Sequence, residues 1–198
     1  RTYLSDYQEE HQSSKVTIDN MRRIFSSFFA WLEDEDYIAK SPVRRIHKVK
    51  TDSLVKEVLS DEQLEQLRDS CTTKRDLAII DFLSSTGIRV GELVKLSRED
   101  IDFHERQCVV FGKGNKERII FLNPACIDAI NNYIPIRNKM NPSDEKALFL
   151  SSRKHRISKR RVQQIVENTL SKAELANKGI TTPAIAPSFS TNKVMALG

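Results

Sequence analysis

The sequence has few of the features that mark secreted, membrane-spanning or zinc-binding proteins. Its 198 residues include three cysteines, which are scattered and form no Cys-x-x-Cys pair. This usage argues against a disulfide framework or a zinc site and favours a reducing, cytoplasmic setting. No apolar run approaches the roughly 18 to 20 residues needed to cross a membrane, and the first residues do not resemble a signal peptide. We therefore expect a soluble, cytoplasmic chain with no membrane partner.

The sequence also lacks the motifs that bind nucleotides and metal ions. No GxxxxGK(S/T) loop occurs, and no cluster of Asp, Glu and His suggests a metal site, so neither a cofactor nor a metal is expected. What is present is a globular composition, with 39% apolar residues, nine Phe and 30% charged residues. A net charge of +5 suggests a polyanionic partner, although a modest excess of lysine is common in proteins that bind none.

Hydrophobic periodicity predicts a mainly α-helical fold with one small antiparallel β-hairpin or sheet. The residues from Ser60 to Gln63 form a capping-box pattern that starts a helix at Asp61, and Ser97–Phe103 is expected to be a polar connector. Two β-prone runs are joined by residues 112–116, whose Gly and Asn favour a tight reversal. The runs are Cys108–Phe111 and Arg118–Phe121, and further helices are expected over Thr17–Leu32, Lys74–Leu83, Pro124–Tyr133 and after Ser158.

The pattern divides the chain into three parts. Residues 1–45 are expected to be part of a helical domain that begins upstream, 46–53 a basic linker, and 54–198 a second domain. Positive charge gathers in and beside the linker, which suggests a strap along a phosphate backbone, and the alternative is a solvated connector. The cations concerned are Arg44, Arg45, Lys48 and Lys50.

The stretch SSTGIRVGELVKL contains the first candidate binding site. A Thr-Gly pair breaks one helical pattern, and Arg89 then opens another. A cation at a helix start faces the unfavourable end of the helix dipole, unless it holds an anion beside the free N–H groups there. Glu92, three residues on, lies on the same face and is expected to orient the Arg89 guanidinium. The alternative is an ordinary surface ion pair.

The second candidate is Lys113, which lies between two glycines at the tip of the predicted hairpin. Its ammonium can extend beyond the domain, and a two-stranded ribbon can enter a DNA groove. Lys116 and Arg118 add positive charge to the same hairpin and are expected to contact DNA. The alternative is that Gly, Asn and Lys at the tip serve only the turn and solubility.

The third candidate is a basic run, with six Lys or Arg among the nine residues from Arg153 to Arg161. Because Ser158 is predicted to cap a helix, part of this run lies at a helix N-terminus, where phosphate groups bind favourably. We expect contact with a DNA backbone, and the alternative is a solvated charged face. The cations are Arg153, Lys154, Arg156, Lys159, Arg160 and Arg161.

Two of these candidates occur together in a known family. TGIRVGEL, followed roughly two dozen residues later by the hairpin sequence GKGNKER, resembles the tyrosine recombinases, which include phage integrases, Xer proteins and conjugative-transposon integrases. LSDEQLEQL and the apolar helix after it also fall in the family's order and spacing. The resemblance covers nearly the whole chain. It implies a partial core-binding domain over residues 1–45 and the catalytic domain from about residue 54.

The resemblance implies a site-specific recombinase or integrase that cuts and rejoins double-stranded DNA through a 3′-phosphotyrosyl intermediate, without a cofactor. Arg89 matches the family's arginine that holds the scissile phosphate, and Lys113 matches the hairpin lysine that protonates the departing 5′-oxygen. A clamp of two domains around duplex DNA, a homo-tetrameric synapse and service to a mobile element are implied as well.

The last residues depart from the family's pattern. The family has a His-x-x-Arg box, then a further His or Trp and the nucleophilic tyrosine, whereas this sequence reads ITTPAIAPSFSTNKVMALG after Gly179. Pro183 and Ala186 occupy expected basic positions, and Tyr133 is the last of the four tyrosines. We therefore expect a truncated or altered recombinase that lacks its nucleophile segment and does not cleave DNA.

Two other functions fit the sequence. One is a catalytically inactive DNA-binding protein of the same fold, which the missing tyrosine favours. The other is a helical protein with a basic surface and no nucleic-acid role. Binding to duplex DNA, and its dependence on salt, distinguishes these possibilities.

Overall fold

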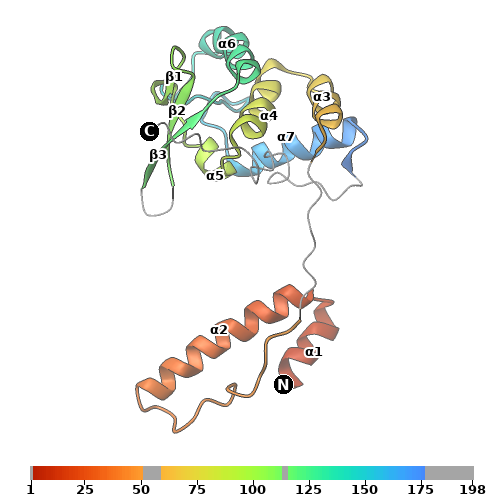
Figure 1. Ribbon diagram of the computed structural model, residues 1–198, viewed down its shortest axis with the longest axis vertical. Helices are drawn as coiled ribbons and strands as arrows, with labels where there is room; N and C mark the ends of the chain where they lie inside the picture. Colours follow the sequence, from red (N-terminus) through yellow and green to blue (C-terminus); the bar gives the residue numbers. More distant parts are fainter. Residues whose placement is uncertain (1, 51–58, 113–115, 177–198) are drawn as a thin grey trace, which may run out of the picture. The chain divides into compact units, whose positions relative to one another are not determined.

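The computed structural model describes residues 2–50, 59–112 and 116–176 of the chain (Figure 1). The chain divides into two compact units, Arg1–Val55 and Lys56–Gly198, and each is considered by itself. Within the described ranges, no helix combines the length and apolar character needed to cross a membrane.

The first unit is built on two consecutive helices. Helix α1 covers Thr2–His11, and helix α2 covers Lys15–Asp34. The start of α2 is set by Ser14, whose hydroxyl accepts a hydrogen bond from the Thr17 amide at 3.1 Å. The predicted helix over Thr17–Leu32 is therefore confirmed, with slightly wider bounds.

The basic segment that follows α2 runs back along that helix (Figure 1). Two backbone amides attach it: Ser41 N–H donates to Glu33 Oε2 at 3.0 Å, and Val49 N–H donates to Asp19 Oδ1 at 3.1 Å. Asp19 is 9% exposed, and its Oδ1 also accepts a hydrogen bond from Arg22 Nε at 2.9 Å. Buried carboxylates that bind both a cation and a backbone amide are well satisfied, so Asp19 fixes the course of this segment.

Helices form most of the second unit and pack around α4. Every residue of α4 from Ala78 to Leu83 is buried, and the helix contacts α3, α6 and α7. Its helices within residues 59–112 and 116–176 are α3 (Asp61–Asp69), α4 (Lys74–Thr86), α5 (Val90–Leu93), α6 (Pro124–Lys139) and α7 (Lys159–Lys172).

Polar side chains set where these helices begin. At α3 the predicted capping box forms, because the Gln63 amide donates to Ser60 Oγ at 3.3 Å and the Ser60 amide donates to Gln63 Oε1 at 3.0 Å. Ser158 caps α7 by accepting a hydrogen bond from the Arg161 amide at 3.2 Å. The buried face of α7 contains the predicted residues Val162, Ile165, Val166 and Leu170.

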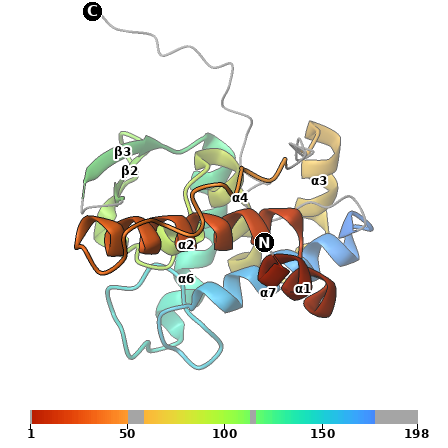
Figure 2. The same ribbon diagram turned by 90° about the horizontal axis from the view of Figure 1, so that it is seen from below.

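A three-stranded antiparallel sheet in the order β1-β2-β3 completes the second unit. Its strands are β1 (Ile101–Asp102), β2 (Gln107–Phe111) and β3 (Glu117–Phe121). The sheet and α3 lie on opposite sides of α4 in both views (Figures 1 and 2). The register pairs Val110, which is buried, with Arg118, so the Arg118 side chain starts on the inward face of the sheet.

The predicted fold class is confirmed, but one segment differs from its prediction. Ser97–Phe103 is not a plain connector, because it contains a 3₁₀ turn at Arg98–Asp100 and strand β1. Of its two apolar residues, Phe103 is exposed, whereas Ile101 is 7% exposed and pairs with Cys108 of β2. One buried side chain suffices to dock a two-residue strand, and it leaves no periodic signal in the sequence.

Helix α6 also continues beyond its predicted end at Tyr133, to Lys139, and it contains Pro135. The continuation is held by a tertiary contact, since Arg137 is 2% exposed and its Nε and Nη2 donate to the Ala147 carbonyl at 3.0 and 2.7 Å. Pro135 is exposed, and the buried hydrogen bonds of the Arg137 guanidinium help to hold the last turn of the helix.

Candidate DNA-phosphate site

Helix α5, which follows the candidate arginine, is a single turn. Gly87 ends α4 in a left-handed conformation with φ of 63°, and its amide donates to the Leu83 carbonyl. Ile88 is then buried, and Arg89 takes the N-cap position of α5 with an extended backbone. Arg89 therefore stands at the mouth of the helix, where the N–H groups of the first turn have no partner within the helix.

The Glu92 carboxylate holds Arg89 in two places. Oε2 accepts a hydrogen bond from the Arg89 backbone N–H at 3.0 Å, and Oε1 accepts one from Arg89 Nη1 at 3.3 Å. The Glu92 side chain is 8% exposed, whereas that of Arg89 is 78% exposed. The guanidinium is thus oriented along one edge and accessible to a ligand along the rest of its surface.

Arg118 of strand β3 binds the same carboxylate with both arms of its guanidinium. Nη2 donates to Glu92 Oε2 at 2.7 Å, and Nη1 donates to Oε1 at 3.1 Å. These hydrogen bonds are the main cause that lowers the pKa of Glu92 to about 2, against the opposing effect of burial. Glu92 is therefore ionised at neutral pH and pairs with two cations, Arg89 and Arg118.

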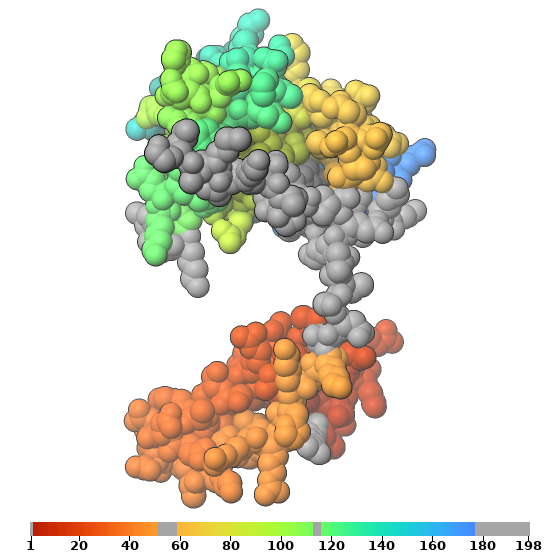
Figure 3. Space-filling model, viewed as in Figure 1, coloured from red at the N-terminus to blue at the C-terminus, as the bar shows by residue number. Residues whose placement is uncertain are grey.

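The sequence predicts that Arg118 contacts DNA, but it does not reveal that the side chain binds the Glu92 carboxylate. The side chain is 41% exposed, but its hydrogen bonds are directed inward to Glu92. Gly112 leaves room for this arrangement, because a Cβ atom there would lie only 3.1 Å from Arg118 Nη1. Residues of β3 and of α5 reach the same lower edge of the second unit in Figure 3.

The start of α7 lies against α5. A Cβ atom on Gly91 would lie 3.3 Å from Cε and 3.5 Å from Nζ of Lys159, so the end of the lysine side chain rests on the glycine. Lys159, Arg160 and Arg161 are exposed in the first turn of α7, where cations are unfavourable unless an anion binds. The structure thus brings Lys159 beside the helix that Arg89 caps, a proximity that the sequence did not reveal.

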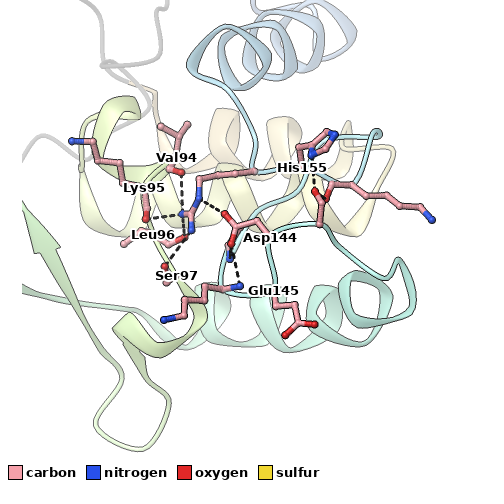
Figure 4. Close-up of polar contacts among 12 residues, drawn as sticks. Val94, Lys95, Leu96, Ser97, Asp144, Glu145 and His155 are labelled. Atoms are coloured by element: carbon pink, nitrogen blue, oxygen red, sulfur yellow. Dashed lines mark hydrogen bonds and ion pairs between the residues drawn. The ribbon is translucent and has the colours of Figure 1, made fainter.

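Arg156 differs from the rest of the basic run, because its guanidinium binds protein groups. Figure 4 shows the carbonyl groups of Val94, Lys95 and Leu96 and the Asp144 carboxylate turned toward one guanidinium, that of Arg156. Nη1 donates to the Lys95 and Leu96 carbonyls at 2.7 and 2.8 Å, and Nε donates to Asp144 Oδ2 at 2.8 Å. The geometry does not support the expectation that Arg156 contacts DNA, since these donors satisfy the carbonyls that follow α5.

The remaining predicted DNA contacts of the second unit are exposed where they are described. The Lys116 carbonyl accepts a hydrogen bond from the Gly112 amide at 2.8 Å, and this bond closes the base of the hairpin. Lys113 lies outside the described residues, as do residues 177–198 with the departure from the family's His-x-x-Arg box. The exposed cations are Lys116, Arg153, Lys154, Lys159, Arg160 and Arg161.

The predicted strap cations belong to the first unit. Arg44, Arg45, Lys48 and Lys50 are exposed on the segment that runs along α2, and Arg44 Nη1 lies 4.0 Å from Glu33 Oε1. The described part of the predicted linker, residues 46–50, is attached through Val49, and residues 51–53 lie outside the described residues.

Other candidates for chemistry are buried or absent in the described part of the chain. Tyr133 is 1% exposed, and its hydroxyl accepts a hydrogen bond from the Leu150 amide at 3.0 Å. Burial raises the pKa of Tyr133, which disfavours the phenolate. Within residues 2–50, 59–112 and 116–176, no three His, Cys, Asp or Glu side chains gather in a way suited to a metal ion.

Comparison with known proteins places the chain in a family. Residues 57–192 match the phage integrase family. The tyrosine recombinase XerC of Caldanaerobacter subterraneus subsp. tengcongensis is 36% identical over 180 residues, covering 89% of this chain and 50% of that protein. XerC of Thermodesulfovibrio yellowstonii is 36% identical over 164 residues, covering 78% of this chain and 54% of that protein. The chain thus spans about half the length of the curated relatives it matches.

Solved structures show the same fold. XerH recombinase bound to a palindromic difH substrate has a TM-score of 0.76 at 19% identity, covering 93% of this chain and 57% of that one. A lambda integrase tetramer bound to a Holliday junction has a TM-score of 0.73 at 17% identity, covering 92% of this chain and 55% of that one. The order of the motifs, the fold and the family match agree, and the chain belongs to the phage integrase family of tyrosine recombinases.

Proposed function

We propose that this chain binds double-stranded DNA and holds one phosphodiester at Arg89 for site-specific strand exchange. The observation that carries the proposal is the Arg89 guanidinium, which is 78% exposed at the mouth of α5 and oriented by Glu92. A planar guanidinium binds two phosphate oxygens at once, and the free N–H groups of a helix start favour the same anion. Lys159, whose side-chain end rests on Gly91, adds a further positive charge against the helix that Arg89 caps.

The proposed reaction is the transfer of a phosphoryl group to tyrosine and back to a 5′-hydroxyl, as in tyrosine recombinases. Arg89 stabilises the negative charge that develops on the phosphate, a kind of interaction worth roughly 10²–10³ in rate. Lys113 protonates the departing 5′-oxygen, which contributes roughly 10²–10⁴. The role of Lys113 rests on its place in GKGNKER, between Gly112 and Lys116 at the base of the hairpin.

The tyrosines of this sequence do not supply an obvious nucleophile. Tyr133 is buried and bound to Leu150, and the other three precede residue 38. We therefore propose that these 198 residues bind and orient DNA but do not form the 3′-phosphotyrosyl bond themselves. The partners are double-stranded DNA and further copies of the protein in a tetrameric synapse, in the cytoplasm and in the service of a mobile element.

Duplex binding tests the proposal. Fluorescence anisotropy with a labelled 30-bp duplex of arbitrary sequence, at several salt concentrations, should give a Kd of about 10⁻⁴–10⁻⁶ M near physiological salt. The logarithm of the binding constant should fall with log salt, with a slope near −0.9 for each phosphate neutralised. Arg89→Ala should weaken binding, and Lys139→Ala on α6 serves as a charge-matched control. Binding that is absent or insensitive to salt contradicts the proposal and supports a helical protein without a nucleic-acid role.

The second candidate function is a DNA-binding protein of the same fold without chemistry, and the burial of Tyr133 favours it. A nicked suicide duplex that traps covalent recombinase–DNA complexes tests whether these 198 residues carry out any chemistry. For this chain we expect duplex binding without a covalent band on a denaturing gel. A covalent adduct on one of the four tyrosines, located by mass spectrometry of the digested complex, would show that the nucleophile was overlooked.

A further inference from the structure

We infer that Arg118 is a positioning residue for Arg89, which it affects through the Glu92 carboxylate and not by touching DNA. The inference rests on the proposed function, because it concerns how the phosphate-binding arginine is kept in place. Strand β3 would then have two structural roles. Besides forming one side of the hairpin, the strand fixes the helix that Arg89 caps.

The first support is the shortness of α5. A helix of four residues gains too few hydrogen bonds to offset the entropy of ordering its backbone, so α5 depends on contacts from other elements. One such contact comes from Arg118 of β3, which binds Glu92 of α5 from 26 positions further along the chain. The 2.7 Å bond from Arg118 Nη2 is the shortest of the four hydrogen bonds that this carboxylate accepts.

The second support is the balance of charge. Glu92 carries one negative charge, and Arg89 and Arg118 carry one positive charge each, so the group retains an excess of one positive charge. Without Arg118, the Glu92 charge would be balanced by Arg89, and the pair would have no net attraction for a phosphate. With Arg118 present, Glu92 orients Arg89 while Arg89 keeps its attraction for an anion.

The third support is the geometry of the fork. Arg118 contacts both carboxylate oxygens with separate nitrogens, at 2.7 and 3.1 Å, and so fixes the rotation of the carboxylate as well as its position. A lysine at this position keeps the charge but cannot make both contacts in one plane. Gly112 packs against the fork, since a Cβ atom there would come within 3.1 Å of Nη1.

The experiment therefore compares Arg118→Lys with wild type, using the whole chain. A matched control is Arg68→Lys, because Arg68 Nε lies 2.9 Å from Oδ1 of Asp81, another carboxylate buried between two elements. Arg68 is on α3, on the far side of α4 from the sheet (Figure 1). The control makes the same chemical change at a comparable ion pair that has no connection to Arg89.

Three measurements are made on each variant. Carbon-13 NMR titration gives the pKa of the Glu92 carboxyl group, and nitrogen-15 relaxation gives the mobility of the Arg89 Nε–H group, both without DNA. Anisotropy with the 30-bp duplex gives the affinity, alone and in the Arg89→Ala background.

In Arg118→Lys we expect the pKa of Glu92 to rise from about 2 toward 4.5, because the largest cause of its lowering is weakened. Arg89 Nε–H should become more mobile, and duplex affinity should fall about tenfold, the size of one charge-assisted hydrogen bond. In the Arg89→Ala background the same change should have almost no further effect. Arg68→Lys should change none of these three quantities.

The opposite pattern overturns the inference. If Arg118→Lys binds duplex as wild type does, and if Arg118→Ala weakens binding equally with and without Arg89, then Arg118 contacts a phosphate directly. Unchanged mobility of Arg89 in Arg118→Lys would overturn it as well. If wild type binds no duplex, the proposed function fails, and the two measurements without DNA still decide whether Arg118 positions Arg89.

Discussion

At the scale of single residues, the site depends on a buried carboxylate with an unusually low pKa. Glu92 accepts hydrogen bonds from two guanidinium groups and from the Arg89 amide, and its pKa is lowered to about 2. A group whose pKa is lowered on folding stabilises the protein above its unfolded pKa, and this stabilisation is lost as pH falls through the folded value. For Glu92 that window runs from about 4.5 down to about 2.

Glu92→Gln should therefore destabilise the protein at neutral pH and make it less sensitive to acid. We expect a loss of about 1–3 kcal/mol in the free energy of unfolding at pH 7, typical for removing a hydrogen-bonded charge. The difference between variant and wild type should shrink as pH falls from 4.5 to 2. Urea unfolding at several pH values measures it, and a constant difference across that range would show that Glu92 is not the titrating group.

The Tyr133→Phe variant tests whether Tyr133 contributes to stability or to DNA binding. The Tyr133 hydroxyl is fully buried and accepts a hydrogen bond from the Leu150 amide. Removing the hydroxyl leaves that amide without this acceptor, which should lower the free energy of unfolding by about 1–3 kcal/mol. Duplex affinity should remain at the wild-type value, since Tyr133 lies in the core. Thermal unfolding and the anisotropy assay measure the two effects. A stable variant with altered DNA binding would place Tyr133 in the site after all.

At the scale of elements, the site is made where α5, β3 and the start of α7 meet. Gly91 of α5 has no positive φ that requires glycine, and only the end of the Lys159 side chain lies above it. Arg156 donates hydrogen bonds to the carbonyls that follow α5. Arg118 donates to Glu92, the residue of α5 that also binds Arg89. A single helical turn is thus fixed by two arginines from later elements.

Gly91→Ala should lower duplex affinity through Lys159 without lowering the stability of the protein. Alanine in a helix is better than glycine by roughly 0.5–1 kcal/mol, and the flexible end of Lys159 can move aside, so stability should be unchanged or slightly higher. Duplex affinity should fall by a few-fold because the ammonium is displaced from its place against α5, the helix that Arg89 caps. Lys159→Ala should have the same effect on affinity, and the double variant should add nothing. Additive losses would mean that Gly91 acts without Lys159.

At the scale of the whole molecule, positive charge is present on both units. The first unit exposes its cations on the segment that Asp19 and Glu33 attach to α2, and the second exposes them around α5 and α7. We propose that cations of both units contact duplex DNA, so both should contribute to the salt dependence of binding.

Replacing the four strap cations of the first unit by Gln tests this distribution of charge. If each contacts one phosphate, the salt slope should fall by about 3 to 4, since each contact contributes about 0.9. Affinity at low salt should fall, and the unfolding temperature should change little because these side chains are exposed. An unchanged slope would leave duplex binding to the second unit. The substituted residues are Arg44, Arg45, Lys48 and Lys50.

Local sequence determined the helix starts, the apolar faces and the hairpin. Ser60 and Gln63 form their capping box three residues apart, and the Arg89–Glu92 contact has the same spacing. Such contacts lie within one helical turn, so a short stretch of sequence contains all the information they need. The motif around Arg89 could therefore be identified without a structure.

Only the tertiary structure decided which arginines bind protein groups and which remain exposed. Arg118 and Arg156 read as two more cations in basic runs, yet they bind Glu92 and the carbonyls after α5, 26 and about 60 positions away. Lys159 meets Gly91 in the same way, through the packing of α7 on α5. Pairings at that separation depend on strand register and helix packing, which no local pattern encodes. The sequence by itself identified the charge and the family, and the fold determined the partners of Arg118 and Arg156.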